Sequence, residues 1–104
     1  MAKYIMVVQS KAKEGRDAEY NEWYDTMHLD DILALPGMTS GRRFDFAAGL
    51  AGEPGRPYLT IYEIETDDIG AVMAELGKRS MDGTIRPTDS LDGPESVLWF
   101  YKER

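Results

Sequence analysis

Cysteine is absent from the chain, and histidine occurs only once, as His28. Without cysteine, disulfide bonds, thiolate metal sites and a cysteine nucleophile are excluded. A zinc site would then depend on one histidine and on carboxylates, which suit harder cations better. The sequence therefore predicts no resident metal and no cofactor.

Long apolar runs and an excess of basic residues are also missing. No stretch approaches the about 20 apolar residues of a membrane span, and the short run Tyr4–Val8 is not a secretion signal. The chain has 12 Lys and Arg against 19 Asp and Glu, a net charge of −7. Phosphate backbones and anionic lipids repel such a chain. We therefore expect no nucleic-acid partner, no membrane association and a cytoplasmic location.

The chain of 104 residues, 42% of them hydrophobic, predicts one domain over residues 1–104. Runs rich in β-branched and aromatic residues predict strands, and apolar residues at helical spacing predict helices. The glycines and prolines of residues 49–57 predict a loop. The expected strands are Tyr4–Ser10, Met38–Ala47, Tyr58–Glu65 and Ser96–Lys102, and the expected helices run from Arg16 or Asp17 to His28, Asp30–Ala34 and Asp68–Lys78.

The resulting order is β-α-β-β-α-β, which predicts an α+β fold of the ferredoxin-like type: a four-stranded antiparallel sheet with both helices on one face. A sheet with one wet face should alternate apolar and polar residues. Here neighbouring residues, which face opposite sides of the sheet, are both apolar, as in Met6 and Val7 or in Leu98 and Trp99. In a chain this short, a second subunit has to cover the other face, so we expect a homodimer packed sheet to sheet.

The first long helix carries the densest group of rings in the chain. Tyr20, Tyr24 and His28 follow one another at i, i+4 spacing, which places them on one helix face, and Trp23 lies between them. Histidine is the side chain that titrates near neutral pH, so His28 is a candidate general acid or base. Asp25 or Asp31 is placed to orient its ring. The alternative is a histidine that hydrogen-bonds a neighbouring carboxylate and helps to end the helix.

Several segments resemble the EthD-like branch of the dimeric α/β-barrel superfamily. They are Asn21–Asp25 with His28, Leu33–Gly37, Ser40–Phe44 and Tyr58–Glu63. The topology covers nearly the whole chain, and the sharper motif covers residues 20–44. One position departs from the pattern, because many relatives carry proline where this chain has Asp30. From the sequence, an aspartate at this position is able to cap the short second helix through its carboxylate.

The resemblance implies a dimeric α/β barrel in which each subunit has its own pocket between helices and sheet. Relatives include cofactor-independent monooxygenases, cyclases, dehydratases, isomerases and haem-degrading proteins. Transferred to this chain, the roof of the pocket is the first helix, with Tyr20, Trp23, Tyr24, Met27 and His28. The floor is formed by every second residue of the strands, on one face of the sheet: Tyr4, Met6, Val8, Tyr62, Val97, Trp99 and Tyr101.

For each remaining candidate residue there is a possible chemical role and a purely structural alternative. The hydroxyls of Tyr24 and Tyr62 are suited to donate hydrogen bonds to a carbonyl or phenolate, or else fill the core. The rings of Trp23 and Trp99 are suited to stack on an aromatic ligand, or else also fill the core. Arg42 and Arg43 point to opposite faces of their strand, and the sequence leaves open which of them faces the pocket. We name Arg43 as the candidate that would bind a substrate carboxylate. Its plainer role is a salt bridge at the rim.

Three functions remain open from the sequence. The first is a cofactor-independent lyase, isomerase, dehydratase or cyclase that acts on a small apolar carbonyl or aromatic compound, with His28 moving the proton and Tyr24 and Asp25 assisting. The second is a cofactor-free monooxygenase of a phenolic substrate. The third is a dimeric ligand-binding or accessory protein without catalysis. Haem handling ranks last.

Overall fold

The computed structural model describes residues 1–53 and 55–104. Its strands are β1 (Ala2–Ser10), β2 (Met38–Asp45), β3 (Tyr58–Thr66) and β4 (Val97–Lys102). Its helical elements are α1 (Asp17–Trp23), the π-helical turn η1 (Tyr24–His28), α2 (Leu29–Leu33), α3 (Ile69–Asp82) and the 3₁₀ turn η2 (Gly93–Glu95). The expected loop lies between β2 and β3, and its Pro54 lies outside the described residues.

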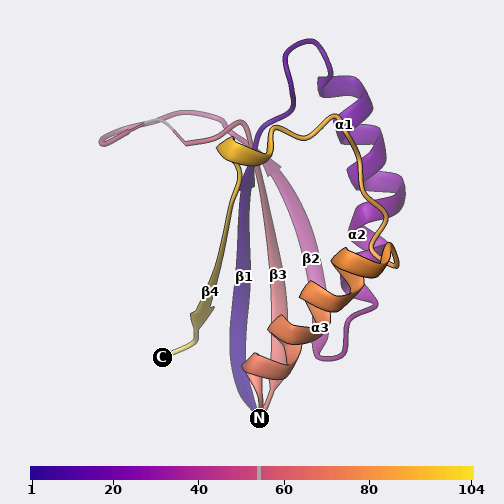
Figure 1. Ribbon diagram of the computed structural model, residues 1–104. Helices are drawn as coiled ribbons and strands as arrows, with labels where there is room; N and C mark the ends of the chain where they lie inside the picture. The colour runs from indigo at the N-terminus through magenta and orange to yellow at the C-terminus, as the bar shows by residue number, and fades with distance from the viewer. Residues whose placement is uncertain (54) are drawn as a thin grey trace.

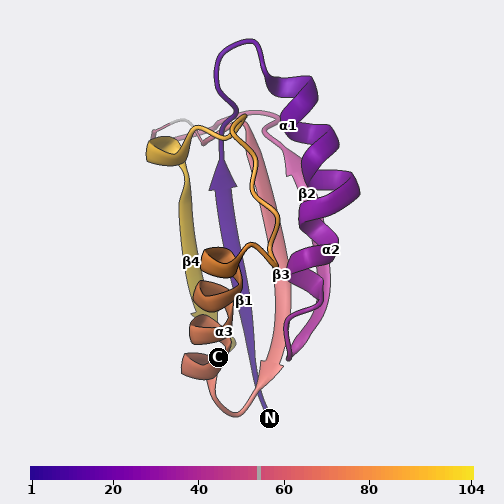
Figure 2. The same ribbon diagram turned by 45° about the vertical axis from the view of Figure 1, so that its right-hand side comes forward.

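The strands form one antiparallel sheet in the order β2-β3-β1-β4. Figure 1 shows the helices on one side of this sheet, and Figure 2 shows α1 and α2 on the side of β2 while α3 lies towards β4. The predicted ferredoxin-like α+β architecture is therefore confirmed. No helix among the described residues has both the length and the hydropathy that crossing a bilayer requires.

Strand pairing extends β1, and α3 also runs further than the sequence pattern predicts. β1 begins at Ala2 because Ala2 and Lys3 pair with Thr66 and Glu65. α3 continues to Asp82, beyond the expected end at Lys78, and stops at Gly83, whose φ of 84° is left-handed. At the other end the Asp68 carboxylate accepts a hydrogen bond from the amide of Ala71 at 3.1 Å, which caps the helix.

The two helices expected before Pro36 are one continuous helical stretch with a π turn in its middle. The amide of Leu29 reaches back to the carbonyl of Tyr24, five residues earlier, where an α-helix would bond four residues earlier. No cap separates His28 from α2, since His28 itself has αR backbone angles. Single π turns inside helices are frequent at functional sites, and this one spans Tyr24 and His28.

The strand register fixes which residues face the helices. Met6 lies opposite Tyr62 on β3 and Phe100 on β4, and Met6 and Tyr62 are buried under the helices. Trp99 lies opposite Val7, so it belongs to the other face, and it is 54% exposed. The expected position of Trp99 on the pocket floor is therefore wrong, as are those of Val97 and Tyr101. The residues of β4 are apolar on both of its faces. The sequence pattern therefore does not determine which of them face the helices.

The face turned away from the helices, here called the open face, has an apolar centre that no described residue covers. It carries Ile5 and Val7 at its centre and the exposed rings of Phe44, Trp99 and Tyr101. Exposed apolar patches of this kind mark interaction surfaces.

Gly41 sets the distance between β2 and the buried ring of Tyr62. A Cβ at Gly41 would lie 2.8 Å from Tyr62 Cδ1 and 3.3 Å from Leu29 Cδ1. Since Tyr62 is fully buried, we expect Gly41→Ala to destabilise the protein by about 1–3 kcal/mol in urea unfolding.

The matched control is Gly77→Ala on α3, where a Cβ meets no atom within 4 Å. That change should stabilise the protein by up to about 1 kcal/mol, because alanine favours a helix interior. Equal stability of the two variants would contradict the close packing of Tyr62.

Candidate functional site

Four rings of the first helical stretch form one aromatic cluster above the sheet. The ring of Trp23 stacks on His28 with centroids 4.3 Å apart, and the ring of Tyr24 meets His28 edge-on at 4.8 Å. Tyr20 packs against Trp23 and Tyr24, both at 5.8 Å. The predicted grouping of Tyr20, Trp23, Tyr24 and His28 is thus present in the structure.

The tyrosines of this cluster are tied to the sheet by their hydroxyls. Tyr24 and Tyr62 share a hydrogen bond of 2.9 Å between hydroxyl oxygens, and Tyr20 bonds the hydroxyl of Ser10. Burial raises the pKa of Tyr62 and the pKa of Tyr24, and it raises the pKa of Tyr20 to about 12. These phenols stay protonated at neutral pH, so they are hydrogen-bond donors and not bases.

Arg43 brings one positive charge into the same cluster. As the register requires, it faces the helices while Arg42 faces away. Its guanidinium carbon lies 4.4 Å from the ring centroid of Tyr24, and its Nη1 and Nη2 donate to Asp25 at 2.8 Å and to Asn21 at 2.9 Å. The Nε of Arg43 is buried without a hydrogen-bond partner. This charge is placed to stabilise an anion that forms beside Tyr24.

His28 is held in its neutral form. Burial lowers the pKa of His28 from 6.5 to about 4; the carboxylate of Asp31 opposes this shift and the charge of Arg43 adds to it. Its Nδ1 is buried and has no hydrogen-bond partner. An unpartnered buried nitrogen costs free energy and calls for an explanation. A neutral imidazole is the form that accepts a proton.

Neither carboxylate that was expected to orient His28 bonds its Nδ1. Asp25 pairs instead with Arg43, at 2.8 Å between Oδ1 and Nη1. Asp31 accepts three hydrogen bonds from Arg86: from its amide at 2.9 Å, its Nε at 3.0 Å and its Nη2 at 2.8 Å. The orienting role predicted for Asp25 is therefore wrong in this structure, and Asp31 acts on His28 only through its charge.

The interior between helix and sheet is filled by side chains in the isolated subunit. Tyr20, Tyr24, Tyr62 and Met6 are at most 2% exposed. Met27 is half-buried. Three of the hollows on the described surface are well defined, and His28 lines none of these three.

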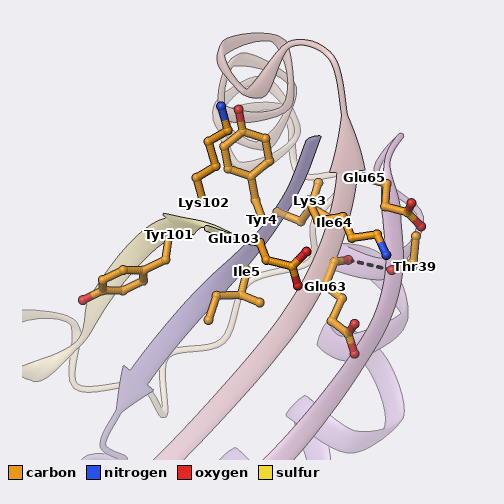
Figure 3. A pocket seen from close by; sticks show the side chains of 10 residues that line it. All are labelled: Lys3, Tyr4, Ile5, Thr39, Glu63, Ile64, Glu65, Tyr101, Lys102 and Glu103. Atoms are coloured by element: carbon orange, nitrogen blue, oxygen red, sulfur yellow. Dashed lines mark hydrogen bonds between the residues drawn. The ribbon is translucent and has the colours of Figure 1, made fainter. Parts of the chain in front are cut away.

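One of these hollows, of about 280 Å³, lies at the far end of the sheet, where Lys3 and Ile5 of β1 meet the end of β4 (Figure 3). Figure 3 shows Tyr4 pointing to the opposite side of the sheet from Ile5. Tyr4 and Tyr101, both predicted on the pocket floor, line it. This hollow lies on the open face and away from the aromatic cluster.

Three residues of the site were not predicted. Tyr58 packs on Tyr20 at 5.4 Å and donates to Asp17 at 2.6 Å, and Asn21 donates to Tyr58 at 3.1 Å. Tyr58 lies four residues before Tyr62 on the same face of β3, so strand alternation would have found it. Arg86 carries no such signal, because it lies in an irregular segment.

No group of three or more His, Asp or Glu side chains among the described residues is placed to hold a metal ion. The chemical groups of the ring cluster are the imidazole of His28 as a proton acceptor, the tyrosine hydroxyls as hydrogen-bond donors and the guanidinium of Arg43.

No family model matches the chain, and no curated protein matches its sequence. The chain is similar to an EthD-like protein from Ralstonia eutropha, with 18% identity, a TM-score of 0.63, and coverage of 96% of this chain and 90% of that one.

Two other similar structures carry names of different activities. A proposed monooxygenase from Shewanella loihica has 12% identity and a TM-score of 0.64 over 100% of this chain and 97% of its own. The haem degrader MhuD from Mycobacterium tuberculosis, with two haems bound in its active site, has 12% identity and a TM-score of 0.67 over 96% and 94%. At these identities the likeness establishes the fold alone: the chain has the ferredoxin-like fold that these structures share.

Proposed function

We propose that this protein is a cofactor-independent enzyme in which His28 moves a proton on a small carbonyl or aromatic compound, as a lyase, isomerase, dehydratase or cyclase. The observation that carries the proposal is the Nδ1 of the half-buried His28, which is buried without a hydrogen-bond partner in a ring whose pKa burial lowers. A merely structural histidine would be expected to satisfy both ring nitrogens.

The surrounding groups support a division of roles. His28 accepts a proton from the carbon or hydroxyl of the substrate, and the hydroxyl of Tyr24 donates a hydrogen bond to the oxygen that becomes negative. Arg43 stabilises that anion. Its charge contributes to the lowered pKa of His28. A forming enolate or phenolate would oppose Arg43 and make His28 a stronger base when it is needed.

Proton exchange tests this proposal without knowledge of the natural substrate. A panel of β-keto esters and phenols is incubated with the protein in D₂O, and loss of the acidic C–H signal is followed by NMR. For a compound that exchanges, we expect His28→Gln to slow exchange by about 10²–10⁴-fold, the usual contribution of a general base. Trp99→Phe on the open face is the control. Exchange that survives His28→Gln would reject the role of His28.

Two alternatives each have an observation in their favour. The cationic Arg43 among tyrosine rings also suits a phenolate, and one similar structure is a proposed monooxygenase; oxygen uptake with phenols, without added metal or flavin, would favour that chemistry. The filled interior favours a protein without catalysis. Binding of panel compounds without exchange or oxygen uptake would support this third function.

Haem handling has a simpler test. A neutral imidazole is the form that ligates iron, and one similar structure holds haem. A hemin titration that gives the same absorption spectrum with wild type and His28→Gln would exclude ligation by His28.

We also propose that the functional unit is a homodimer joined through the open face. The exposed rings of Phe44, Trp99 and Tyr101 support this assembly. Sheet-to-sheet packing would bury them while leaving the helix side of each subunit free.

A further inference from the structure

The loop between β2 and β3 leaves the sheet on the side of the open face. Figures 1 and 2 show it projecting away from the helices and leaning towards the side of β4. Its first part, Phe46–Glu53, is here called the arm. One backbone hydrogen bond, from the amide of Phe46 to the carbonyl of Pro57 at 2.8 Å, closes the base of the loop. Arg56 holds this base beside η2, because its Nε donates to the carbonyl of Glu95.

The arm is apolar and exposed to solvent. Glu53 is its one charged residue, and all of its residues are exposed in the subunit. Leu50 is 103% exposed and Phe46 is 46% exposed. Among the described residues, none from Ala47 to Glu53 makes a backbone–backbone hydrogen bond. An apolar segment that gains so little from its own subunit marks an interaction surface.

The opposite end of the open face is hollowed and acidic. The hollow of about 280 Å³ in Figure 3 lies there. The side chains that line it from the open face are Ile5 and Tyr101, the carboxylates of Glu63, Glu65 and Glu103, and the cation of Lys3. Lys102 lines the hollow from the helix side, next to Tyr4. This end of the open face therefore carries a surplus of negative charge.

The half of the open face nearer the arm carries arginines instead. Arg42 lies on this face of β2, opposite Ile61. Arg56 lines a second hollow, of about 190 Å³, at the base of the arm, and Asp45 is the one carboxylate among the residues that line it. The two ends of the open face thus differ in charge.

A twofold dimer packed sheet to sheet has two possible arrangements. Packed sheets keep their strand directions within about 30° of each other, so the strands of the two copies run either nearly parallel or nearly antiparallel. In the parallel arrangement Glu63, Glu65 and Glu103 of both copies would meet at one end, and like charges brought together across an interface cost free energy. In the antiparallel arrangement each acidic end faces an end with arginines. The charge pattern therefore favours antiparallel strands.

The antiparallel arrangement also brings each arm to the hollow of the other copy. The arm follows the end of β2, whereas the hollow lies at the opposite end of the sheet. Packed sheets lie about 10 Å apart, and residues 46–50 span up to about 17 Å when extended. The arm is therefore long enough to reach the sheet of a second copy.

We propose that two copies of this chain pack with antiparallel strands and that the arm of each copy covers the acidic hollow of the other, with Leu50 against its apolar floor. This inference rests on the proposed homodimer and deepens it, because it specifies the orientation of the two sheets and a segment that joins them. It also gives the exposed arm and the hollow one common purpose.

The absence of cysteine allows the orientation to be measured with one spin label per subunit. Glu103 is exposed, so a label on Glu103→Cys marks the acidic end. β1 has 9 residues, which is about 30 Å at about 3.3 Å per residue. By double electron–electron resonance we expect the two labels of a dimer to lie about 30 Å or more apart. Parallel strands would bring them within about 20 Å, because both would lie at the same end of two sheets about 10 Å apart.

The role of the arm is tested by Leu50→Glu. We expect the dissociation constant of the dimer to rise by at least about tenfold, because two buried leucines are lost and a carboxylate is brought to each acidic hollow. The matched control is Met81→Glu on α3, which is 92% exposed but lies on the helix side. Its dissociation constant should stay within about twofold of wild type. Sedimentation over a dilution series measures both.

A label separation within about 20 Å would overturn the antiparallel arrangement. Equal dissociation constants for Leu50→Glu and Met81→Glu would overturn the role of the arm. In either case a dimeric wild type would leave the proposed homodimer intact, whereas a monomeric wild type would reject the homodimer and this inference with it.

Discussion

Lowering the pH from about 6.5 to about 4 is expected to cost the folded protein about 3 kcal/mol of stability through His28. Burial lowers the pKa of His28 from 6.5 to about 4 in the folded state. In this window the unfolded chain binds a proton at His28 and the folded chain does not. The stabilising contribution is therefore fully present above pH 6.5 and is lost as the pH falls towards the folded pKa.

The measurement is urea unfolding at several pH values for wild type and His28→Phe. Phenylalanine keeps a ring against Trp23 and cannot titrate, so its stability should change far less between pH 6.5 and 4. At pH 7 we expect it to equal or exceed wild type by about 1 kcal/mol, since an unpartnered buried nitrogen is removed. The carboxylates of Asp31 and Asp89, each paired with an arginine, have lowered pKa values. Their contribution to stability is therefore lost at a lower pH than that of His28. Parallel pH profiles for the two proteins would contradict the lowered pKa of His28 in the folded state.

Replacement of Trp99 by glutamate is expected to convert the proposed dimer into monomers. Trp99 stands in the open face beside Tyr101 and Val7, and it is 54% exposed in the subunit. In a sheet-to-sheet dimer the substitution would bury an unpaired carboxylate on each side and remove two large apolar contacts. We expect the dissociation constant to rise by at least about 10³-fold, or about 4 kcal/mol.

Leu98→Glu is the matched control for the dimer. Leu98 is the neighbouring residue on β4 and is 44% exposed, but it lies on the helix side, opposite Val8. Sedimentation at micromolar concentration should find wild type and Leu98→Glu as dimers and Trp99→Glu as monomers. A monomeric wild type, or equal dissociation of the two variants, would contradict assembly through the open face.

The fold and much of the ring cluster were predictable because both depend on local periodicity. Spacing of four residues placed Tyr20, Tyr24 and His28 together, and the order of elements indicated the ferredoxin-like sheet. Apolar residues on both sides of the strands predicted that the sheet face turned away from the helices is also apolar. These features repeat over whole elements, so small errors at the ends do not change them.

What the sequence left hidden depends on pairing between distant segments. The phase of β4 is set by its register with β1, where Val7 lies opposite Trp99. The partners of Asp25 and Asp31 come from Arg43 on β2 and from Arg86 in an irregular segment. The π turn at Tyr24–His28 has no composition signal, because it is one displaced hydrogen bond within a helix.

The state of His28 is the central claim, and the lone histidine allows it to be measured without ambiguity. An NMR titration of its ring protons gives the pKa of the folded protein. We predict a value of about 4, with a neutral ring throughout the range in which the proposed enzyme would work. A pKa at or above the ordinary 6.5 would show a solvated or hydrogen-bonded histidine, and would contradict the buried proton acceptor on which the proposed function rests.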